Sequence, residues 1–200
     1  MNEDATEQRK KQIVDAAMVL FLAKGLNNTS MNEIVKASGL SKGGVYHYFA
    51  SKNDIVKSVI QAFADMQMTS LYSLMEVPDK SVREKMLIMI EFASQAHEEA
   101  KHLTQVTLDF FALAPHKPDI KEFIQGHYKN YLNLLTQLIE RGIKSGEFRP
   151  ETDAAQVAMG LAAIFDGLGV AYVVIGDQVD VMAVGKQTLI QVLDGISQPS

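Results

Sequence analysis

Hydrophobic residues recur every three or four positions along most of the chain, which is the spacing of one face of an α-helix. In the first stretch, residues 7–24, the apolar positions Ile13, Ala17 and Phe21 share one stripe, and Gly25 follows as a natural left-handed cap. The strict alternation of half-buried strands is nearly absent. The pattern therefore predicts an all-α fold with about nine helices.

Cap residues divide these stretches from one another. Ser30 precedes Glu33 by three positions and Ser81 precedes Glu84 in the same way, which is the spacing of a capping box at the start of a helix. The apolar period lapses at 97–102, where we expect a break. The helices are expected at about 7–24, 30–38, 41–49, 52–75, 81–93, 103–113, 119–144, 153–174 and 180–196.

Two short helices joined by a turn at Gly39 are expected between residues 30 and 49. Such a helix-turn-helix presents its second helix to the DNA major groove while the first lies across the backbone. The second helix has little to bury except Val45 and Phe49. We therefore predict an N-terminal helix-turn-helix DNA-binding domain at 1–57 and a C-terminal helical ligand-binding and dimerisation domain at 58–200.

Charge is divided along the chain in the same way. The whole chain carries a net charge of −5, but residues 1–57 hold eight Lys/Arg against six Asp/Glu, which gives +2. The remainder holds 11 against 18, which gives −7. A weakly basic N-terminal segment, which we call the head, followed by an acidic remainder favours the approach of a polyanion at the head only.

The run from residue 30 to residue 52 resembles the signature of the tetracycline-repressor (TetR) family. The resemblance is close over about the first 55 residues, through 30–35, 39–49 and 51–52. Beyond them it rests on length, helix order, the segment 146–149 and the pair Asp166-Gly167. It implies a ligand-responsive transcription regulator, most often a repressor.

The resemblance also assigns roles within the head. It implies that the hydroxyls of Thr29 and Ser30 contact phosphate, and that side chains of the second helix face base edges and phosphates. Taken singly, the tyrosines could be core rings and the lysines solvated. The implied DNA contacts are Thr29, Ser30, Ser41, Lys42, Gly43, Tyr46, His47, Tyr48 and Lys52.

One helix-turn-helix covers a single half-site, and two copies about 34 to 36 Å apart read successive turns of the groove, so we expect a homodimer on a palindromic operator. In the resembling family, the helices corresponding to 119–144 and 153–174 form an intermolecular four-helix bundle. The glycines of the second helix could instead pack within one subunit. The expected dimer contacts are Leu132, Leu135, Ile164, Gly167 and Val170.

Methionines and the pair Phe110-Phe111 are frequent between about residues 66 and 113. Flexible thioethers and aromatic rings suit an adaptable cavity for a small, apolar effector, and they suit an ordinary core equally well. The expected effector contacts are Met89, Phe92, Phe110, Phe111 and Tyr128.

Other function classes find little support. His97 and His102 lie five positions apart, which does not stack them on one helix face as a zinc site requires, and the chain has no cysteine. We expect no metal and no cofactor. Histidines and carboxylates such as His116, Glu91 and Asp109 could serve an enzyme, but no catalytic motif organises them. A helical adaptor that binds protein through the head is a further alternative, which salt-dependent DNA binding would exclude.

The stretch 154–175 is long enough to cross a membrane. A carboxylate near its centre, Asp166, would cost on the order of 2.5 to 3.5 kcal/mol there, so we interpret the stretch as a helix buried on protein. The acidic N-terminus lacks the pattern of a secretory signal. We therefore expect a cytoplasmic protein.

Overall fold

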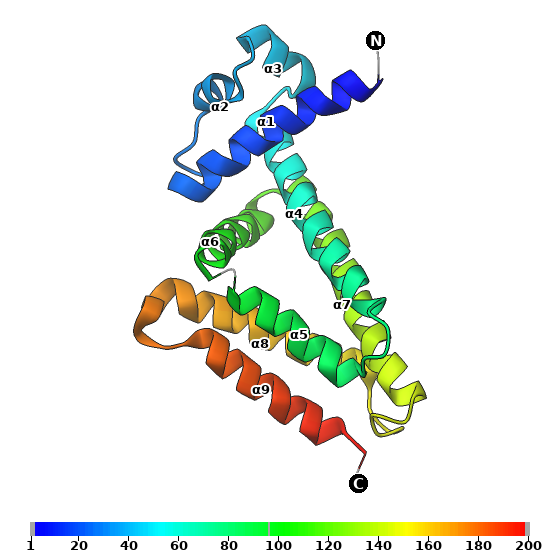
Figure 1. The fold of residues 1–200 in the computed structure, drawn as a ribbon. Helices are drawn as coiled ribbons and strands as arrows, with labels where there is room; N and C mark the ends of the chain where they lie inside the picture. Colours follow the sequence, from blue (N-terminus) through cyan, green and yellow to red (C-terminus); the bar gives the residue numbers. More distant parts are fainter. Residues whose placement is uncertain (1–2, 96, 199–200) are drawn as a thin grey trace. The chain divides into compact units, whose positions relative to one another are not determined.

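The computed structural model describes residues 3–95 and 97–198, except for the side chains of residues 3, 63, 67, 92–95, 97–104 and 177. Within this part the chain forms nine α-helices and two short 3₁₀ turns, with no strand, which confirms the predicted all-α fold. The helices, shown in Figure 1, are α1 (Glu3–Lys24), α2 (Met31–Ser38), α3 (Lys42–Tyr48), α4 (Lys52–Met75), α5 (Val82–Gln95), α6 (His97–Leu113), α7 (Pro118–Lys144), α8 (Ala154–Ile175) and α9 (Val181–Ile196).

The expected break at 97–102 is wrong, because α6 already begins at His97. The apolar period does lapse there, but Glu98 and Glu99 are good helix formers, and negative charge is favourable in the first turn of a helix. Local propensity therefore extends the helix where no hydrophobic stripe supports it.

The helices group into two compact units. Unit 1 comprises the described residues up to Met66 together with Gln105–Ile124, and unit 2 comprises the described parts of Gln67–Thr104 and of the chain from Gln125 onwards. This grouping differs from the division predicted after Lys57: α4 contributes further to unit 1, and a segment from the middle of the chain joins it.

Unit 1 is built around the stripe on α1. Ile13, Ala17 and Phe21 are buried, as their spacing predicts, and they belong to one core with Ile34 of α2 and Val45 of α3. Further side chains of this core come from α4 and from the segment 105–124; they include Ile55, Val56, Val59, Val106, Phe110 and Ile120.

Polar contacts also hold the segment 105–124 to the rest of unit 1. The Asp109 carboxylate accepts a hydrogen bond from the backbone N–H of Leu26, just after α1, at 3.1 Å. The Lys117 ammonium donates to Asn53 in the first turn of α4, at 2.9 Å. The segment 105–124 is therefore a structural part of unit 1, although it lies far in sequence from the N-terminal helices of that unit.

In unit 2 the segment 146–149 ties the end of α7 to the start of α5. The ring of Phe148 is fully buried against Gly142 of α7, so closely that a Cβ atom at Gly142 would lie 2.3 Å from it. The Glu147 carboxylate accepts the first free N–H groups of α5, from Val82 at 2.8 Å and from Arg83 at 2.7 Å. This caps α5 and fixes its start beside the end of α7.

The apolar helix α8 is largely exposed within a single chain. Only 22% of its most apolar window is buried, and Met159, Val170 and Val174 are 49%, 44% and 75% exposed. By length and composition α8 is the one described helix that could cross a membrane. The remaining helices of unit 2 cover only part of its surface, so the expected burial of this helix on protein is not reached within a single chain and stays a prediction.

Candidate DNA interface

The helix α2 starts and ends at the residues that the sequence predicts. Ser30 is the N-cap: its Oγ accepts the N–H of Glu33 at 3.3 Å, and its own N–H donates to the Glu33 carboxylate at 2.8 Å, which completes the capping box. The helix ends at Gly39, whose φ of 69° is a left-handed conformation that glycine adopts without strain. The turn that follows leads directly into α3.

The helix α3 is short and is anchored on one side only. The Ser41 Oγ caps it by accepting the N–H of Gly44 at 3.1 Å. Val45 is fully buried in the core of unit 1, and Phe49 just beyond the helix is 5% exposed. Because these two residues fix the inner face, the side chains of Lys42, Tyr46 and His47 are turned outward.

The outward face of α3 carries the side chains that the sequence analysis assigned to DNA. Lys42, Tyr46 and His47 are exposed, and the Lys42 ammonium lies 5.9 Å from the centre of the Tyr46 ring. The rings of His47 and Tyr48 meet edge to face with their centres 5.0 Å apart. Tyr48 is half-buried and packs against the core of unit 1, so it combines the core role and the surface role that its sequence position left open.

The two glycines of α3 differ in whether their surroundings leave room for a side chain. A Cβ atom at Gly44 would lie 3.2 Å from the Ser41 Oγ that caps the helix, so this residue has an internal reason to be glycine. A Cβ atom at Gly43 would meet nothing within 4 Å. Gly43 is exposed as well, and the protein itself therefore gives no reason for its lack of a side chain.

Thr29 does not lie where the resemblance implies. It is 2% exposed, and its hydroxyl donates to the carbonyl of Gly25 at 3.0 Å. The side chain thus closes the turn after α1 and faces the protein interior. Ser30, the next residue, is exposed at the N-terminus of α2, but its hydroxyl donates to the Glu33 carboxylate at 2.7 Å within the capping box.

Lys52, the implied phosphate contact at the start of α4, is half-buried. Its ammonium donates to the carbonyl of Leu26 at 2.6 Å. Burial lowers the pKa of Lys52, and the neighbouring charges of Lys117 and Lys24 lower it further. A phosphate at this position would relieve that repulsion, because an opposite charge favours the protonated form.

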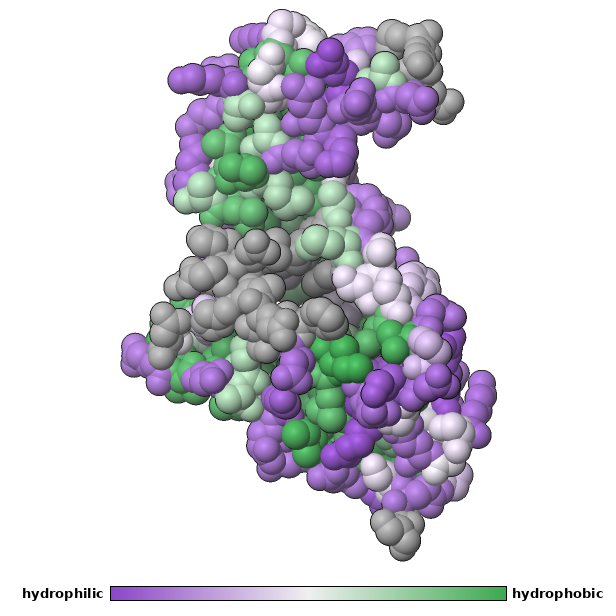
Figure 2. All heavy atoms as spheres, viewed as in Figure 1, coloured by the Kyte–Doolittle hydropathy of each residue, from purple (hydrophilic) through white to green (hydrophobic). Residues whose placement is uncertain are grey.

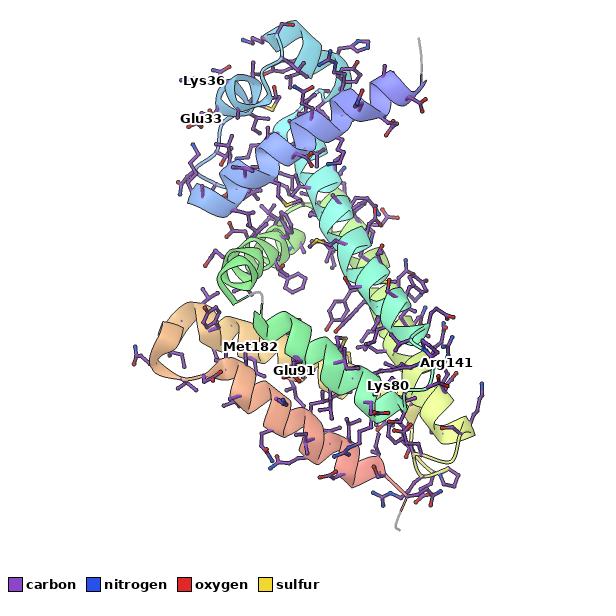
Figure 3. All side chains as sticks on the ribbon, viewed as in Figure 1. Glu33, Lys36, Lys80, Glu91, Arg141 and Met182 are labelled. Atoms are coloured by element: carbon purple, nitrogen blue, oxygen red, sulfur yellow. The ribbon has the colours of Figure 1, made fainter. Side chains whose placement is uncertain are left out.

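Sequence reasoning missed this group of cations. Lys24 forms an ion pair with Glu33 of α2, whose pKa it lowers, together with Ser30, to about 2. Lys117 reaches the group from the segment before α7, and no local motif marks it. Figure 3 shows Glu33 and Lys36 on the same side of α2, and Figure 2 shows hydrophilic side chains over α2 and the N-terminal end of α1.

The predicted effector contacts do not come from one core. Met89 and Tyr128 pack against the core of unit 2, whereas Phe110 is 3% exposed in the core of unit 1. Phe111, also in unit 1, is half-buried. The side chain of Phe92 lies outside the described residues.

The predicted dimer contacts fall into two groups. Leu135 of α7 is 2% exposed and belongs to the core of unit 2, and Leu132 is partly buried against the same core. The apolar face of α7 is therefore used within its own subunit, so the expectation that Leu135 meets a partner is wrong. On α8, Ile164 is half-buried, while Gly167 and Val170 are exposed.

Among the described side chains, no group of three His, Cys, Asp or Glu residues is placed to hold a metal ion. The side chains of His97 and His102, which the sequence analysis considered for zinc, lie outside the described residues.

Comparison with known families matches both parts of the chain. Residues 13–59 match the family described as "Bacterial regulatory proteins, tetR family". Residues 82–194, more than half of the chain, match the family described as "BetI-type transcriptional repressor, C-terminal". The two matches follow one another along the sequence without overlap.

Curated relatives match over almost the whole length. The HTH-type transcriptional repressor KstR2 of Rhodococcus jostii is 26% identical over 202 residues, which covers 96% of this chain and 92% of the relative. The fatty acid metabolism regulator protein of Bacillus subtilis is 25% identical over 188 residues, which covers 92% of this chain and 94% of the relative.

Solved structures show the same fold. A TetR transcription regulator from Haloarcula marismortui superposes with a TM-score of 0.85 at 20% identity, over 96% of this chain and 100% of that one. A structure described as a transcriptional regulator from Saccharomonospora viridis in complex with choline gives a TM-score of 0.82 at 22% identity, with the same coverage of both chains.

Proposed function

Because this chain belongs to the tetR family of bacterial regulatory proteins, we propose that it is a homodimeric repressor that binds a palindromic operator and is released by a small molecule. The family consists of helix-turn-helix transcription regulators and not of enzymes. The proposal adds three features to this: DNA contact through α3, a dimer face on α8 and an effector site in unit 2. We place the protein in the cytoplasm, where its DNA is.

The observation that carries the DNA contact is the one-sided anchoring of α3. Val45 fixes its inner face, and Lys42, Tyr46 and His47 stand on its outer face. A lysine, a phenol and an imidazole supply hydrogen-bond donors and positive charge to phosphates and base edges. The N-termini of α2 and α3 add free backbone N–H groups, which favour anions.

The observation that supports the dimer face is an exposed apolar stripe on α8, which we call the α8 stripe: Met159, Ala163, Gly167, Val170 and Val174. Steps of three and four residues place these positions on one side of the helix. A Cβ atom at Gly167 would meet nothing within 4 Å of its own chain, so a partner helix has room to approach closely. A second copy of α8 that covers the stripe would remove its side chains from water and yield a symmetric interface.

The effector is proposed to be a small molecule of mainly apolar character. The choline complex of the Saccharomonospora viridis regulator shows that a protein of this fold can hold a small ligand. In this chain, Met89 and Tyr128 are half-buried beside the core of unit 2 and are the predicted contacts that remain there. A ligand that binds one conformation of the protein better than the other shifts the equilibrium toward release from DNA.

The decisive experiment selects bound duplexes from a random pool and then measures affinity for the selected sequence at several salt concentrations. We expect a palindrome with half-sites about one helical turn apart, and an affinity that falls steeply with salt because phosphate contacts release counterions. Lys42→Ala should cost about 1 to 3 kcal/mol per head if the lysine reads a base, or lower the salt slope by about one per head if it binds phosphate.

The matched control is Lys129→Ala, which removes an exposed lysine of α7 in unit 2. It should leave both the affinity and the salt slope unchanged. A wild-type protein that selects no sequence, or a Lys42→Ala variant that binds like the wild type at every salt concentration, would contradict the proposed contact. A helical adaptor for protein partners would show no salt-dependent affinity for DNA at all.

A further inference from the structure

Two lysines meet at the start of α4 without a carboxylate partner. The Lys52 ammonium donates to the carbonyl of Leu26 at 2.6 Å, and the Lys117 ammonium donates to the side-chain oxygen of Asn53 at 2.9 Å. Lys52 and Asn53 are neighbours in the chain, so both ammoniums lie at the same end of the helix. Both acceptors are neutral, and none of the ion pairs that the structure describes includes either lysine.

The carboxylates of the neighbouring segments are bound by other groups. Each of those with a described contact there accepts a hydrogen bond or forms an ion pair elsewhere: Glu33 with Lys24, Asp54 with Ser51, Asp109 with the N–H of Leu26, and Asp119 with Lys57. The positive charges of Lys52 and Lys117 are therefore not neutralised by direct contact.

The two charges repel each other in the protein alone. Burial is the largest cause that lowers the pKa of Lys52; the charge of Lys117 follows and Lys24 adds to it, while Glu33 raises this pKa. Both Lys52 and Lys117 are half-buried, where charges are screened less than in water. An anion in contact with both ammoniums would turn the repulsion into attraction, because an opposite charge favours the protonated form. The arrangement therefore favours an anion at the start of α4.

We propose that Lys117 is a further DNA contact and binds, together with Lys52, one phosphate of the operator backbone. This inference rests on the proposed function, because it adds a residue to the same interface. Lysine serves phosphate as a point charge, so two ammoniums can share one phosphate without a fixed geometry. Lys117 lies outside residues 13–59, which match the tetR family, and within the C-terminal match at 82–194. The interface then includes a residue from outside the helix-turn-helix.

Lys117→Gln tests the contribution of the charge. Glutamine retains an amide that can donate to Asn53, but it has no charge with which to displace a counterion from DNA. Affinity is measured by fluorescence anisotropy on the selected operator and on an unrelated duplex. The slope of log affinity against log salt should become shallower by about one per head, or about two for a dimer. The loss of affinity should therefore shrink by on the order of tenfold between roughly 50 and 200 mM salt. The effect should be equal on both duplexes, because a phosphate contact reads no base.

Two further variants make the test specific. Lys121→Gln removes an exposed lysine of the same unit, one turn further along α7, and should leave the affinity and the slope unchanged. It changes the net charge of the chain by the same amount as Lys117→Gln, so it corrects for long-range effects. Lys117→Arg keeps the positive charge and should keep the slope of the wild type. Thermal unfolding checks that each variant is folded.

A footprint of the wild type keeps the test valid if Lys117→Gln does not fold. The lysines are acetylated to a low extent with and without operator, and the modified positions are quantified by mass spectrometry. The reagent attacks only the neutral amine, whereas an ammonium in contact with phosphate stays protonated and covered. The operator should therefore slow the acetylation of Lys52 and Lys117 severalfold and leave that of Lys121 unchanged.

A salt slope in Lys117→Gln equal to that of the wild type would overturn the proposal, even if the affinity falls. A loss by the same factor at every salt concentration indicates a structural role. An equal change of slope in Lys121→Gln would overturn it as well, and so would acetylation of Lys117 that the operator does not slow. In these cases the wild type still binds its operator with a steep salt dependence, and the repressor proposal stands. A wild type that selects no operator refutes the repressor proposal and this contact with it.

Discussion

Gly43→Ala tests whether the backbone of α3 touches DNA. In the protein alone this change meets no obstacle, because an added Cβ atom would have nothing within 4 Å. Alanine also loses less backbone entropy than glycine on folding. In the first turn of a helix the gain is about 0.5 kcal/mol, or about 1 to 2 °C in Tm for a chain of this size. The variant should therefore be slightly more stable than the wild type.

DNA binding should change in the opposite direction. If the backbone of Gly43 lies in van der Waals contact with the duplex, a methyl group pushes the helix outward and breaks at least one charge-assisted hydrogen bond per head. Such bonds contribute about 1.5 to 3 kcal/mol each. The two heads of a dimer double the loss to about 3 to 6 kcal/mol, which corresponds to about 10² to 10⁴ in affinity.

The assay pairs thermal unfolding with fluorescence anisotropy on the selected operator. Gly126→Ala is the matched control: it lies exposed in α7, and its Cβ atom would also meet nothing within 4 Å. This control should gain stability and keep full affinity. A Gly43→Ala variant that is more stable and binds the operator as tightly as the wild type would refute the close approach of α3 to DNA.

Three further outcomes are expected. Val174→Glu places a charge on the α8 stripe and should give a monomer by light scattering. Val19→Glu, at a similarly exposed valine of α1, is the control and should remain dimeric. If both variants are dimeric, the proposed dimer face is contradicted. Gly142→Ala forces a methyl group onto the ring of Phe148 and should cost about 1 to 3 kcal/mol in urea unfolding, and an unchanged midpoint would show that the ring moves freely. The carboxyl of Glu33, with its pKa lowered to about 2, stabilises the fold fully above pH 4.5 and loses this effect as the pH falls toward 2; an NMR titration at the ordinary pKa of 4.5 would exclude the ion pair.

Local signals in the sequence predicted the start of the interface well. The capping boxes at Ser30 and Ser81 both form, with donor and acceptor as their spacing requires. Gly39 ends α2 in the left-handed conformation that the pattern indicated. These features depend on residues at most a few positions apart, so the sequence contains all the information that specifies them.

Features that depend on distant residues were not predictable. Nothing in the sequence signals that Asp109 meets the end of α1 or that Lys117 joins the cations near Lys52. Hydropathy likewise cannot tell an apolar residue covered by its own chain from one that is left exposed. Leu135 and Val170 look equivalent in the sequence, but the first is buried in its subunit and the second is 44% exposed.

The points at which the chain crosses between its two units limit how one unit could be exchanged for that of another protein. The chain crosses between them after residues 66, 104 and 124, and each crossing lies inside a helix, α4, α6 or α7, instead of in a loop. Unit 2 of another regulator thus cannot be joined through one linker, because it needs three junctions, each in helical register. One inserted residue at a junction turns everything beyond it by about 100° around the helix axis. An exchange of unit 2 between two proteins with this division would therefore have to preserve the helical register at residues 66, 104 and 124 together.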